Sequence, residues 1–285
     1  MNRNIFLLKY LQKQLNSATR KYSLKSDGIL SVKYMDGIKT LTMTDQQTRN
    51  ALSIKMMKNL IENITMDNDN PELRVIVISA EGKVFSAGHN LKELSPLTEK
   101  SIHEEVFKIG SELMDAIIDC PVPVIAKVNG VAAAAGCQLV AQCDLAICSE
   151  SSSFLTPGVN FGIFCSTPGV ALARSVSKST AMKMLLTGKA ISALEAKNSG
   201  LVADISKVEN LDQTVEVYCE DIKMKSREVI KLGKQFYYKQ LNLGAKQAYR
   251  IGGNIMVKNL QLPDGKEGIN SFIEKRKASW THGMK

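Results

Sequence analysis

Residues 129–144 read NGVAAAAGCQLVAQCD, and an earlier stretch, residues 84–91, reads VFSAGHNL. Each pattern predicts a strand followed by a turn of small residues that leads into a helix. The first amides of a helix have no intrahelical partner, so both turns are expected to present uncovered N–H groups to a ligand. Two such turns together can form an oxyanion hole. Gln138, whose side chain is an amide, stands at the end of the second turn.

The composition is that of a globular domain. The chain has 285 residues, of which 44% are hydrophobic, and its mean hydropathy is −0.08. This length and apolar content suffice for a sizeable core. No apolar run approaches the roughly 20 residues that a membrane span requires, so no spanning helix is expected.

The net charge of +9 is concentrated at the N-terminus. The chain has no acid before Asp27, while apolar residues recur at helical spacing among the basic ones: Ile5, Phe6, Leu8, Leu11 and Leu15. A basic, amphipathic segment without acids is typical of a mitochondrial transit peptide, which we expect to span residues 1–22 and to be removed in the matrix. The alternative is a disordered N-terminus of a cytosolic protein. Residues 1–22 carry five basic residues, so their removal leaves +4, which disfavours a nucleic-acid partner.

The cysteines and histidines do not suggest a metal site. No C-x-x-C pair occurs among the six cysteines, and the chain has only three histidines. We therefore expect free, mostly buried thiols. Cys165 lies in a glycine-rich stretch, but no base partner accompanies it, which argues against a nucleophile.

The first half of the chain alternates strands and helices. Residues 29–34 and 38–43 alternate around Asp36-Gly37, which predicts a hairpin. Further patterns follow in order: a helix capped by Ser53, residues 54–66; a strand, 74–79; a helix, 102–118; a strand, 124–128; and a strand, 145–148. This order is typical of a βα superhelix with parallel strands.

Beyond Pro168 the sequence becomes mainly helical. Amphipathic patterns cover residues 182–186, 193–198, 208–223, 227–241, 245–259 and 266–277, with one short apolar run around Val202. We therefore predict an α/β core at residues 23–205 and a C-terminal helical module at 206–285.

Several motifs resemble the crotonase, or enoyl-CoA hydratase, superfamily. They are RNAL at 49–52, VFSAGHNLKEL at 84–94, PVIAKVNGVAAAAGCQLVAQCD at 123–144 and TPGVNFGIFCSTPG at 156–169. Their joint order and spacing cover about residues 28–277. The resemblance implies a crotonase-type ββα superhelix core with a C-terminal helical module for trimerisation, and assembly as a homotrimer or as a hexamer of two trimers.

The resemblance also implies roles for individual residues. The acyl-CoA thioester carbonyl would be held by the backbone N–H groups of His89 and Ala135, and the small residues at 132–136 would let the thioester approach the backbone. Main-chain contacts at Ala51 and Ala87 and the basic side chain of Lys92 match the regions that bind coenzyme A. No separate cofactor and no metal are predicted, because coenzyme A enters as part of the substrate.

Two residues break the family pattern. Family hydratases use two glutamates as base and acid, and these positions correspond to Gln138 and Gly158. A glutamine cannot exchange a proton at neutral pH, and a glycine has no side chain with which to do so. Hydration by the two-glutamate route is therefore not predicted for this chain.

Three other side chains are candidates to replace the missing carboxylates. The His89 side chain, Glu112 and Asp115 are candidate bases by residue type. Asn90 is interpreted as a turn cap, Glu93 as a solvated loop charge, and Asp144 as a cap or ion-pair partner. The leading expectation is that no strong acid and base pair exists.

Two hypotheses about function remain. The first is an enzyme of fatty acid metabolism with atypical lyase, isomerase or thioester chemistry on an acyl-CoA. The second is a non-catalytic acyl-CoA binder that regulates lipid metabolism. Both require the two turns, and the loss of both glutamates favours the second.

Overall fold

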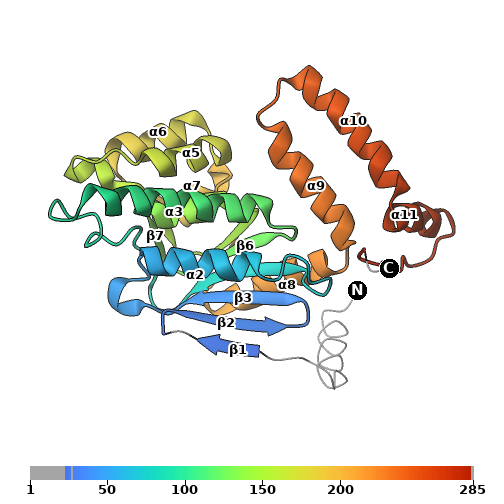
Figure 1. Cartoon of the computed structure of the whole chain (residues 1–285), viewed down its shortest axis with the longest axis horizontal. Helices are drawn as coiled ribbons and strands as arrows, with labels where there is room; N and C mark the ends of the chain where they lie inside the picture. The colour runs from blue at the N-terminus through green and yellow to red at the C-terminus, as the bar shows by residue number, and fades with distance from the viewer. Residues whose placement is uncertain (1–22, 27, 284–285) are drawn as a thin grey trace.

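The structure, a computed structural model, describes residues 23–26 and 28–283. The predicted transit peptide at residues 1–22 lies outside the described residues. Two sheets and a set of helices around them form the core, and three C-terminal helices stand apart from it (Figure 1).

The larger sheet has seven strands in the order β1-β2-β3-β4-β6-β8-β11. The bounds are β1, Ser23–Ser26; β2, Leu30–Met35; β3, Ile38–Met43; β4, Val75–Ala80; β6, Val124–Val128; β8, Leu145–Ser149; and β11, Asp204–Ser206. Strands β2 and β3 form the predicted hairpin, with Asp36 and Gly37 both at positive φ. From β3 onward neighbouring strands are parallel, as the alternation of strands and helices predicted.

The smaller sheet has four strands in the order β10-β9-β7-β5. Its strands are β5, Val84–Ser86; β7, Val131–Ala133; β9, Ser153–Leu155; and β10, Ile191–Ser192. Strands β5, β7 and β9 run parallel and end at one edge, where the two small-residue turns begin. This edge therefore brings together stretches that lie far apart in the sequence.

Helices cover both sheets. Those of the core are α2, Ile54–Thr65; α3, Lys100–Asp119; α4, Ala135–Gln142; α5, Ser166–Ser175; α6, Lys178–Thr187; α7, Ala193–Ser199; and α8, Leu211–Lys223; single 3-10 turns are η1, Gln46–Thr48; η2, Pro157–Phe161; and η3, Val208–Asn210. The Ser53 hydroxyl accepts from Met56 N–H at 3.2 Å and caps α2, as predicted.

The apolar core lies between the sheets and the inner helices. Its main cluster joins β3, β4, α2, α3 and α4, and fully buried members include Leu41, Met57, Leu113, Phe85 and Leu139. A second cluster lies on the opposite face of the larger sheet, where Leu211, Val215 and Cys219 of α8 pack against β4 and β6. Helix α8 is therefore a layer of the core, and the projecting arm begins after it.

The arm consists of α9, Arg227–Gln240; α10, Ala245–Gln261; and α11, Pro263–Ile273. In Figure 1 these helices lie to one side of the sheets. Lys234 of α9 anchors the arm, because its ammonium donates to Asp144 Oδ2 at 2.6 Å, to Ile117 O at 2.8 Å and to Val122 O at 3.1 Å. Tyr238 OH donates to the other oxygen of Asp144 at 2.9 Å. Asp144 is thus the ion-pair partner that was expected.

The C-terminal tail folds back onto the elbow between α8 and α9. Trp280 Nε1 donates to Met224 O at 2.7 Å, and the buried carboxylate of Asp264 accepts from the Ser226 hydroxyl at 2.5 Å and from Thr281 N–H at 2.7 Å. Several hydrogen bonds therefore fix the direction in which the arm leaves the core. The division predicted at residues 205 and 206 stays a prediction.

Candidate functional site

The two predicted turns are in direct contact. A Cβ placed on Gly88 would lie 2.9 Å from Ala133 O, 2.9 Å from Ala134 Cβ and 3.2 Å from Ala135 N. Only a glycine lets the backbone of the first turn approach the start of α4 this closely, and its φ of +91° is a second reason for glycine there. His89 directly follows Gly88, so the turn that carries the His89 N–H borders the start of α4, while the role of the two N–H groups stays a prediction.

Ala134, the residue before α4, holds a strained backbone. Its φ of 49° and ψ of −118° fall outside the regions that residues with a Cβ favour. Ala134 N–H donates to Leu155 O at 2.9 Å, and Gln138 N–H donates to Ala134 O at 3.0 Å. The amides of Ala135 and Gly136 precede the hydrogen-bonded part of the helix and point out of its N-terminus. Strain of this kind is typical of functional sites, where it fixes the direction of a backbone group.

The side chain of His89 packs beneath the turn. Its ring lies edge-on to Phe107 of α3, with the ring centroids 5.5 Å apart, and Nδ1 is 3.3 Å from Leu52 O. Burial lowers the pKa of His89, and the contact with Leu52 O opposes this only in part. A neutral, packed imidazole supports the position of the turn, whereas the role proposed from the sequence belongs to the backbone.

The RNAL motif holds the first turn from the other side. Arg49 and Asn50 both have positive φ, and the buried Asn50 amide donates to Glu81 O and Val84 O at 3.0 and 2.9 Å. Ala87 N–H donates to Arg49 O at 3.0 Å, and Leu52 N–H donates to Gly88 O at 2.8 Å. The hydrogen bonds of the RNAL motif therefore fix the loop that carries His89.

The residues expected to contact coenzyme A lie in or near the RNAL motif and the first turn. Ala51 is buried, and both of its backbone groups are hydrogen-bonded within the protein: its N–H donates to the Thr48 hydroxyl at 3.2 Å, and its carbonyl accepts from Ser53 N–H at 2.9 Å. Ala87 is exposed at the surface of the turn, and Lys92 is exposed three residues beyond His89. Their roles in binding stay predictions.

Two neighbouring polar residues have structural roles. Asn90 Oδ1 accepts from Lys92 N–H at 3.0 Å, which is the expected turn cap. Glu93 is not a free solvated charge, because its carboxylate accepts from Ile54 N–H at 3.1 and 3.3 Å and so caps α2 from a distance. Partial burial raises the pKa of Glu93, and the bond to Ile54 opposes the shift.

Gln138 lies on α4, three residues after Ala135. It is 7% exposed, and its side-chain amide has no partner among the described residues. By contrast, the buried amide of Asn50 donates two hydrogen bonds. The Gln138 amide atoms are not among the buried side-chain atoms that lack a partner, so this amide keeps contact with solvent, whereas Oδ1 of Asn50 is buried without a partner.

Gly158, at the second glutamate position, is closed by its own loop. A Cβ placed there would lie 2.3 Å from Ile163 O and 2.8 Å from Cys165 Sγ. The loop folds back because Ile163 N–H donates to Gly158 O at 2.9 Å. This chain therefore lacks the carboxylate and also the space in which its side chain would begin.

The other candidate acids, bases and nucleophiles are unsuited to the task. Glu112 and Asp115 are exposed on α3, and Glu112 pairs with Lys108 at 3.8 Å. All six cysteines are free and buried, as expected. Burial raises the pKa of Cys165, and it raises the pKa of Cys137 to about 12, so both thiols stay protonated.

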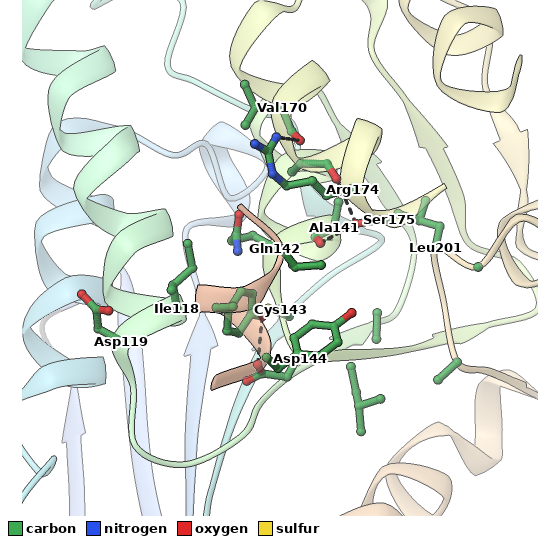
Figure 2. Close-up of a pocket in the computed structure, with 18 of the residues that line it drawn as sticks. Ile118, Asp119, Ala141, Gln142, Cys143, Asp144, Val170, Arg174, Ser175 and Leu201 are labelled. Atoms are coloured by element: carbon green, nitrogen blue, oxygen red, sulfur yellow. Dashed lines mark hydrogen bonds between the residues drawn. The ribbon is translucent and has the colours of Figure 1, made fainter. Parts of the chain in front are cut away.

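A cavity of about 660 Å³ lies at the other end of α4. Figure 2 shows Gln142, Cys143 and Asp144 entering it from the end of that helix, opposite Arg174 and Ser175 of α5. Helix α4 has eight residues and is therefore about 12 Å long, so this cavity is separate from the turns at its N-terminus. Tyr237 and Tyr238 of α9 line its far side, which makes it a space between the core and the arm.

Within residues 23–26 and 28–283, no three His, Cys, Asp or Glu side chains gather in a way that could hold a metal ion. Over the same residues, no helix has both the length and the apolar character needed to cross a membrane.

The chain is similar to known proteins over most of its length. Residues 33–283 match the family model of enoyl-CoA hydratase/isomerase. The chain belongs to this family. It is 50% identical over 246 residues to enoyl-CoA hydratase domain-containing protein 3, mitochondrial, of Xenopus laevis, a match that covers 86% of this chain and 84% of that protein.

Solved structures confirm the crotonase-type fold. The crystal structure of human enoyl coenzyme A hydratase domain-containing protein 3 superposes with a TM-score of 0.87 at 48% identity and covers 88% of this chain and all of that one. An enoyl-CoA hydratase from Mycobacterium smegmatis gives a TM-score of 0.84 at 39% identity, covering 91% of this chain and 98% of that one.

Sequence reasoning missed three features of the site. The positive φ of Ala134, the closure of the loop over Gly158 and the unpaired hydroxyl of Thr156 all depend on contacts between distant segments. The run of four alanines gave no sign of which one is strained. In the sequence, Thr156 and Pro157 serve only to locate Gly158, the residue that follows them.

Proposed function

We propose that this protein binds an acyl-CoA thioester in the mitochondrial matrix, as part of fatty acid metabolism. The thioester oxygen accepts hydrogen bonds from the backbone N–H groups of His89 and Ala135. The contact of Gly88 with the strained turn at Ala134 carries the proposal, because the two turns that hold the proposed donors touch there. The basic segment at residues 1–22 and the relatives named mitochondrial support the location.

The reaction, if the protein has one, differs from hydration by two glutamates. Gln138 replaces one carboxylate, and Gly158 leaves no room for the other. Each of the two N–H donors contributes about 3 to 4 kcal/mol when charge develops on the thioester oxygen. The proposed lyase or isomerase chemistry therefore keeps this stabilisation, and its proton transfer is assigned to a group other than residues 138 and 158. The alternative function, a non-catalytic acyl-CoA binder, is favoured by the same closure of Gly158.

Assembly is a further part of the proposal. Large apolar side chains are exposed on the arm, among them Tyr249 at 83%, Met256 at 60% and Phe272 at 85%. Exposed apolar surface of this extent is typical of a subunit contact. We propose a homotrimer, or a hexamer of two trimers, in which the arm contacts neighbouring subunits.

The binding proposal is tested by calorimetric titration with butyryl-CoA and with free coenzyme A. We expect butyryl-CoA to bind more tightly, because only the thioester reaches the two N–H groups. Gly88→Ala should abolish the difference, since the added Cβ would lie 3.2 Å from Ala135 N. Gly253→Ala is the matched control, because a Cβ there meets nothing within 4 Å.

Turnover of crotonyl-CoA and longer enoyl-CoA esters separates the enzyme from the binder. Formation of 3-hydroxyacyl-CoA at hydratase-like rates, lost in Gly88→Ala and kept in Gly253→Ala, would rule out the binder. Binding without any turnover would favour it. Equal affinity for butyryl-CoA and free coenzyme A would contradict the proposed function itself.

A further inference from the structure

The loop that follows Gly158 turns large apolar side chains outward. Its backbone closes on itself, because Ile163 N–H donates to Gly158 O at 2.9 Å. Phe161, Ile163 and Phe164 are 56%, 51% and 48% exposed. Apolar side chains of this size cost free energy when they face water, so a loop that holds three of them outward indicates a surface for an apolar contact.

Helix α6 extends this apolar surface. The Asn160 side chain of the loop lies against the end of α6, since a Cβ placed on Gly188 would lie 2.8 Å from it. On α6 itself, Met182 and Leu186 are four residues apart and share one face, and they are 38% and 57% exposed. In Figure 1, α5 and α6 lie at the outer edge of the core, away from β1 and from the arm. We give the name apolar patch to five side chains of this surface: Phe161, Ile163, Phe164, Met182 and Leu186.

The charge around the apolar patch has one sign. Residues 151–194 contain no acid and four basic residues: Arg174, Lys178, Lys183 and Lys189. Lys178 lies four residues before Met182 and Lys183 three residues before Leu186, so exposed cations border the apolar side chains of α6. Glu195, which follows this stretch, pairs with Lys183 at 2.9 Å. The patch therefore suits a partner that is both apolar and anionic.

The arm of a second copy does not have this chemistry. Residues 229–263, which form α9 and α10, contain six basic residues and no acid. Its exposed apolar side chains would bring cations toward the cations of the patch, which is unfavourable. A bilayer with anionic lipid offers both features, since its headgroups attract lysines and its acyl chains accept apolar side chains.

We propose that the apolar patch, with Lys178 and Lys189 at its border, docks this protein on the surface of a bilayer that contains anionic lipid. The side chains of the loop enter the boundary between headgroups and acyl chains, and the lysines stay at the level of the phosphates. This contact lies on the surface of the membrane and does not depend on the proposed binding of a thioester.

The test measures how strongly the full chain partitions onto vesicles, by co-sedimentation with phosphatidylcholine alone and with an equimolar mixture of phosphatidylcholine and phosphatidylglycerol. We expect binding to the mixed vesicles and much weaker binding to phosphatidylcholine. The double change Phe161→Ser and Phe164→Ser should weaken binding at least about tenfold, and Lys178→Gln with Lys189→Gln by about tenfold.

The matched control removes two apolar side chains from another surface. Val208 and Val217 are 55% and 54% exposed, and α8, which carries Val217, packs against the opposite face of the larger sheet. Val208→Ser with Val217→Ser should therefore leave the partition coefficient unchanged.

An added tryptophan shows which surface meets the lipid. The fluorescence of Phe161→Trp should be quenched by vesicles whose acyl chains carry bromine, whereas that of Val217→Trp should persist. The basic segment at residues 1–22 is present in both variants, so a difference between them reports the patch.

Equal partitioning of the wild-type protein and of Phe161→Ser with Phe164→Ser, or equal quenching of the two tryptophan variants, overturns the proposal. Absence of vesicle binding, together with a smaller mass of that double variant by light scattering, would assign the patch to a subunit contact instead. Absence of vesicle binding with binding of duplex RNA that the same double change abolishes would assign it to a nucleic acid. Each of these results leaves the proposed acyl-CoA site intact, because that site is tested by calorimetry with butyryl-CoA.

Discussion

Ala134 shows how one residue sets the direction of the donor that follows it. Its positive φ costs about 1 to 2 kcal/mol, and the surrounding hydrogen bonds to Leu155 and Gln138 hold it there. Glycine adopts this conformation without strain, whereas alanine does not. The backbone conformation at residue 134 is therefore maintained by its neighbours and not by the alanine itself.

Ala134→Gly is therefore expected to stabilise the protein. The free energy of unfolding in urea should rise by about 1 kcal/mol, because the relief of strain exceeds the added freedom of the unfolded chain. Ala133→Gly is the control, since Ala133 lies in β7 at negative φ and should lose about 0.5 to 1 kcal/mol. A loss of stability in Ala134→Gly equal to that of the control would show that residue 134 is unstrained.

His89 makes stability depend on pH in a specific window. Burial lowers its pKa in the folded protein, so the unfolded chain binds a proton at a higher pH than the folded one does. Its contribution is complete above the ordinary pKa of about 6.5 and is lost as the pH falls from there toward the folded pKa. The slope for one such group reaches at most about 1.4 kcal/mol per pH unit.

Urea unfolding of the wild-type protein and of His89→Gln between pH 7.5 and 5.5 tests this. The wild-type protein should lose more stability than the variant as the pH falls. The difference between the two proteins removes the effect of His282, whose pKa is also lowered, chiefly by burial and then by Arg74. Parallel pH profiles would mean that the ring is solvated and does not hold the turn.

At the scale of elements, the sequence predicted those with a strong period and missed those without one. The hairpin at Asp36-Gly37 and helices α2 and α3 formed where predicted, because their apolar spacing is regular. Helix α5 was not predicted, since Pro168 and Gly169 indicate a break. Pro168 lies in the first turn of α5, where a missing N–H does no harm.

The short strands of the smaller sheet could not be predicted for another reason. Strands β7 and β9 have three residues each, too few for an alternating pattern, and they exist because neighbouring strands pair with them. They also position the site, since β7 leads into Ala134 and β9 into Thr156. The geometry of the site is therefore a product of pairing between segments, while its residue types could be named from the motifs alone.

The link between α9 and the core depends on Lys234. Its side chain is 7% exposed, and the paired carboxylate of Asp144 is 16% exposed. Lys234→Met would leave a partly buried carboxylate without its cation, so we expect a loss of about 3 kcal/mol in the free energy of unfolding. Lys239→Met, at an exposed position of the same helix, should change it by less than about 0.5 kcal/mol.

Hydrogen exchange of the backbone amides shows which part of the protein the Lys234→Met change destabilises. In Lys234→Met the amides of α9 should exchange faster while those of α2 stay protected, because the arm is released before the core opens. A small loss of stability with unchanged exchange in α9 would contradict the anchoring role of Lys234.

At the scale of the whole molecule, the helix α4 joins the proposed thioester site to a separate cavity. The N-terminus of α4 carries the proposed thioester site, and its C-terminal end meets the cavity beside α9 in Figure 2. The arm leaves the core at the elbow between α8 and α9 (Figure 1). Large apolar side chains of the arm are exposed. The proposed thioester site and this cavity therefore lie at opposite ends of α4.

Infrared difference spectroscopy of bound butyryl-CoA, with ¹³C at the thioester carbonyl, tests the central claim most directly. Two backbone N–H donors should lower the carbonyl stretching frequency on binding, and Gly88→Ala should lose that shift while Gly253→Ala keeps it. A bound thioester whose carbonyl frequency equals that in water, or whose shift is unchanged in Gly88→Ala, would contradict the account.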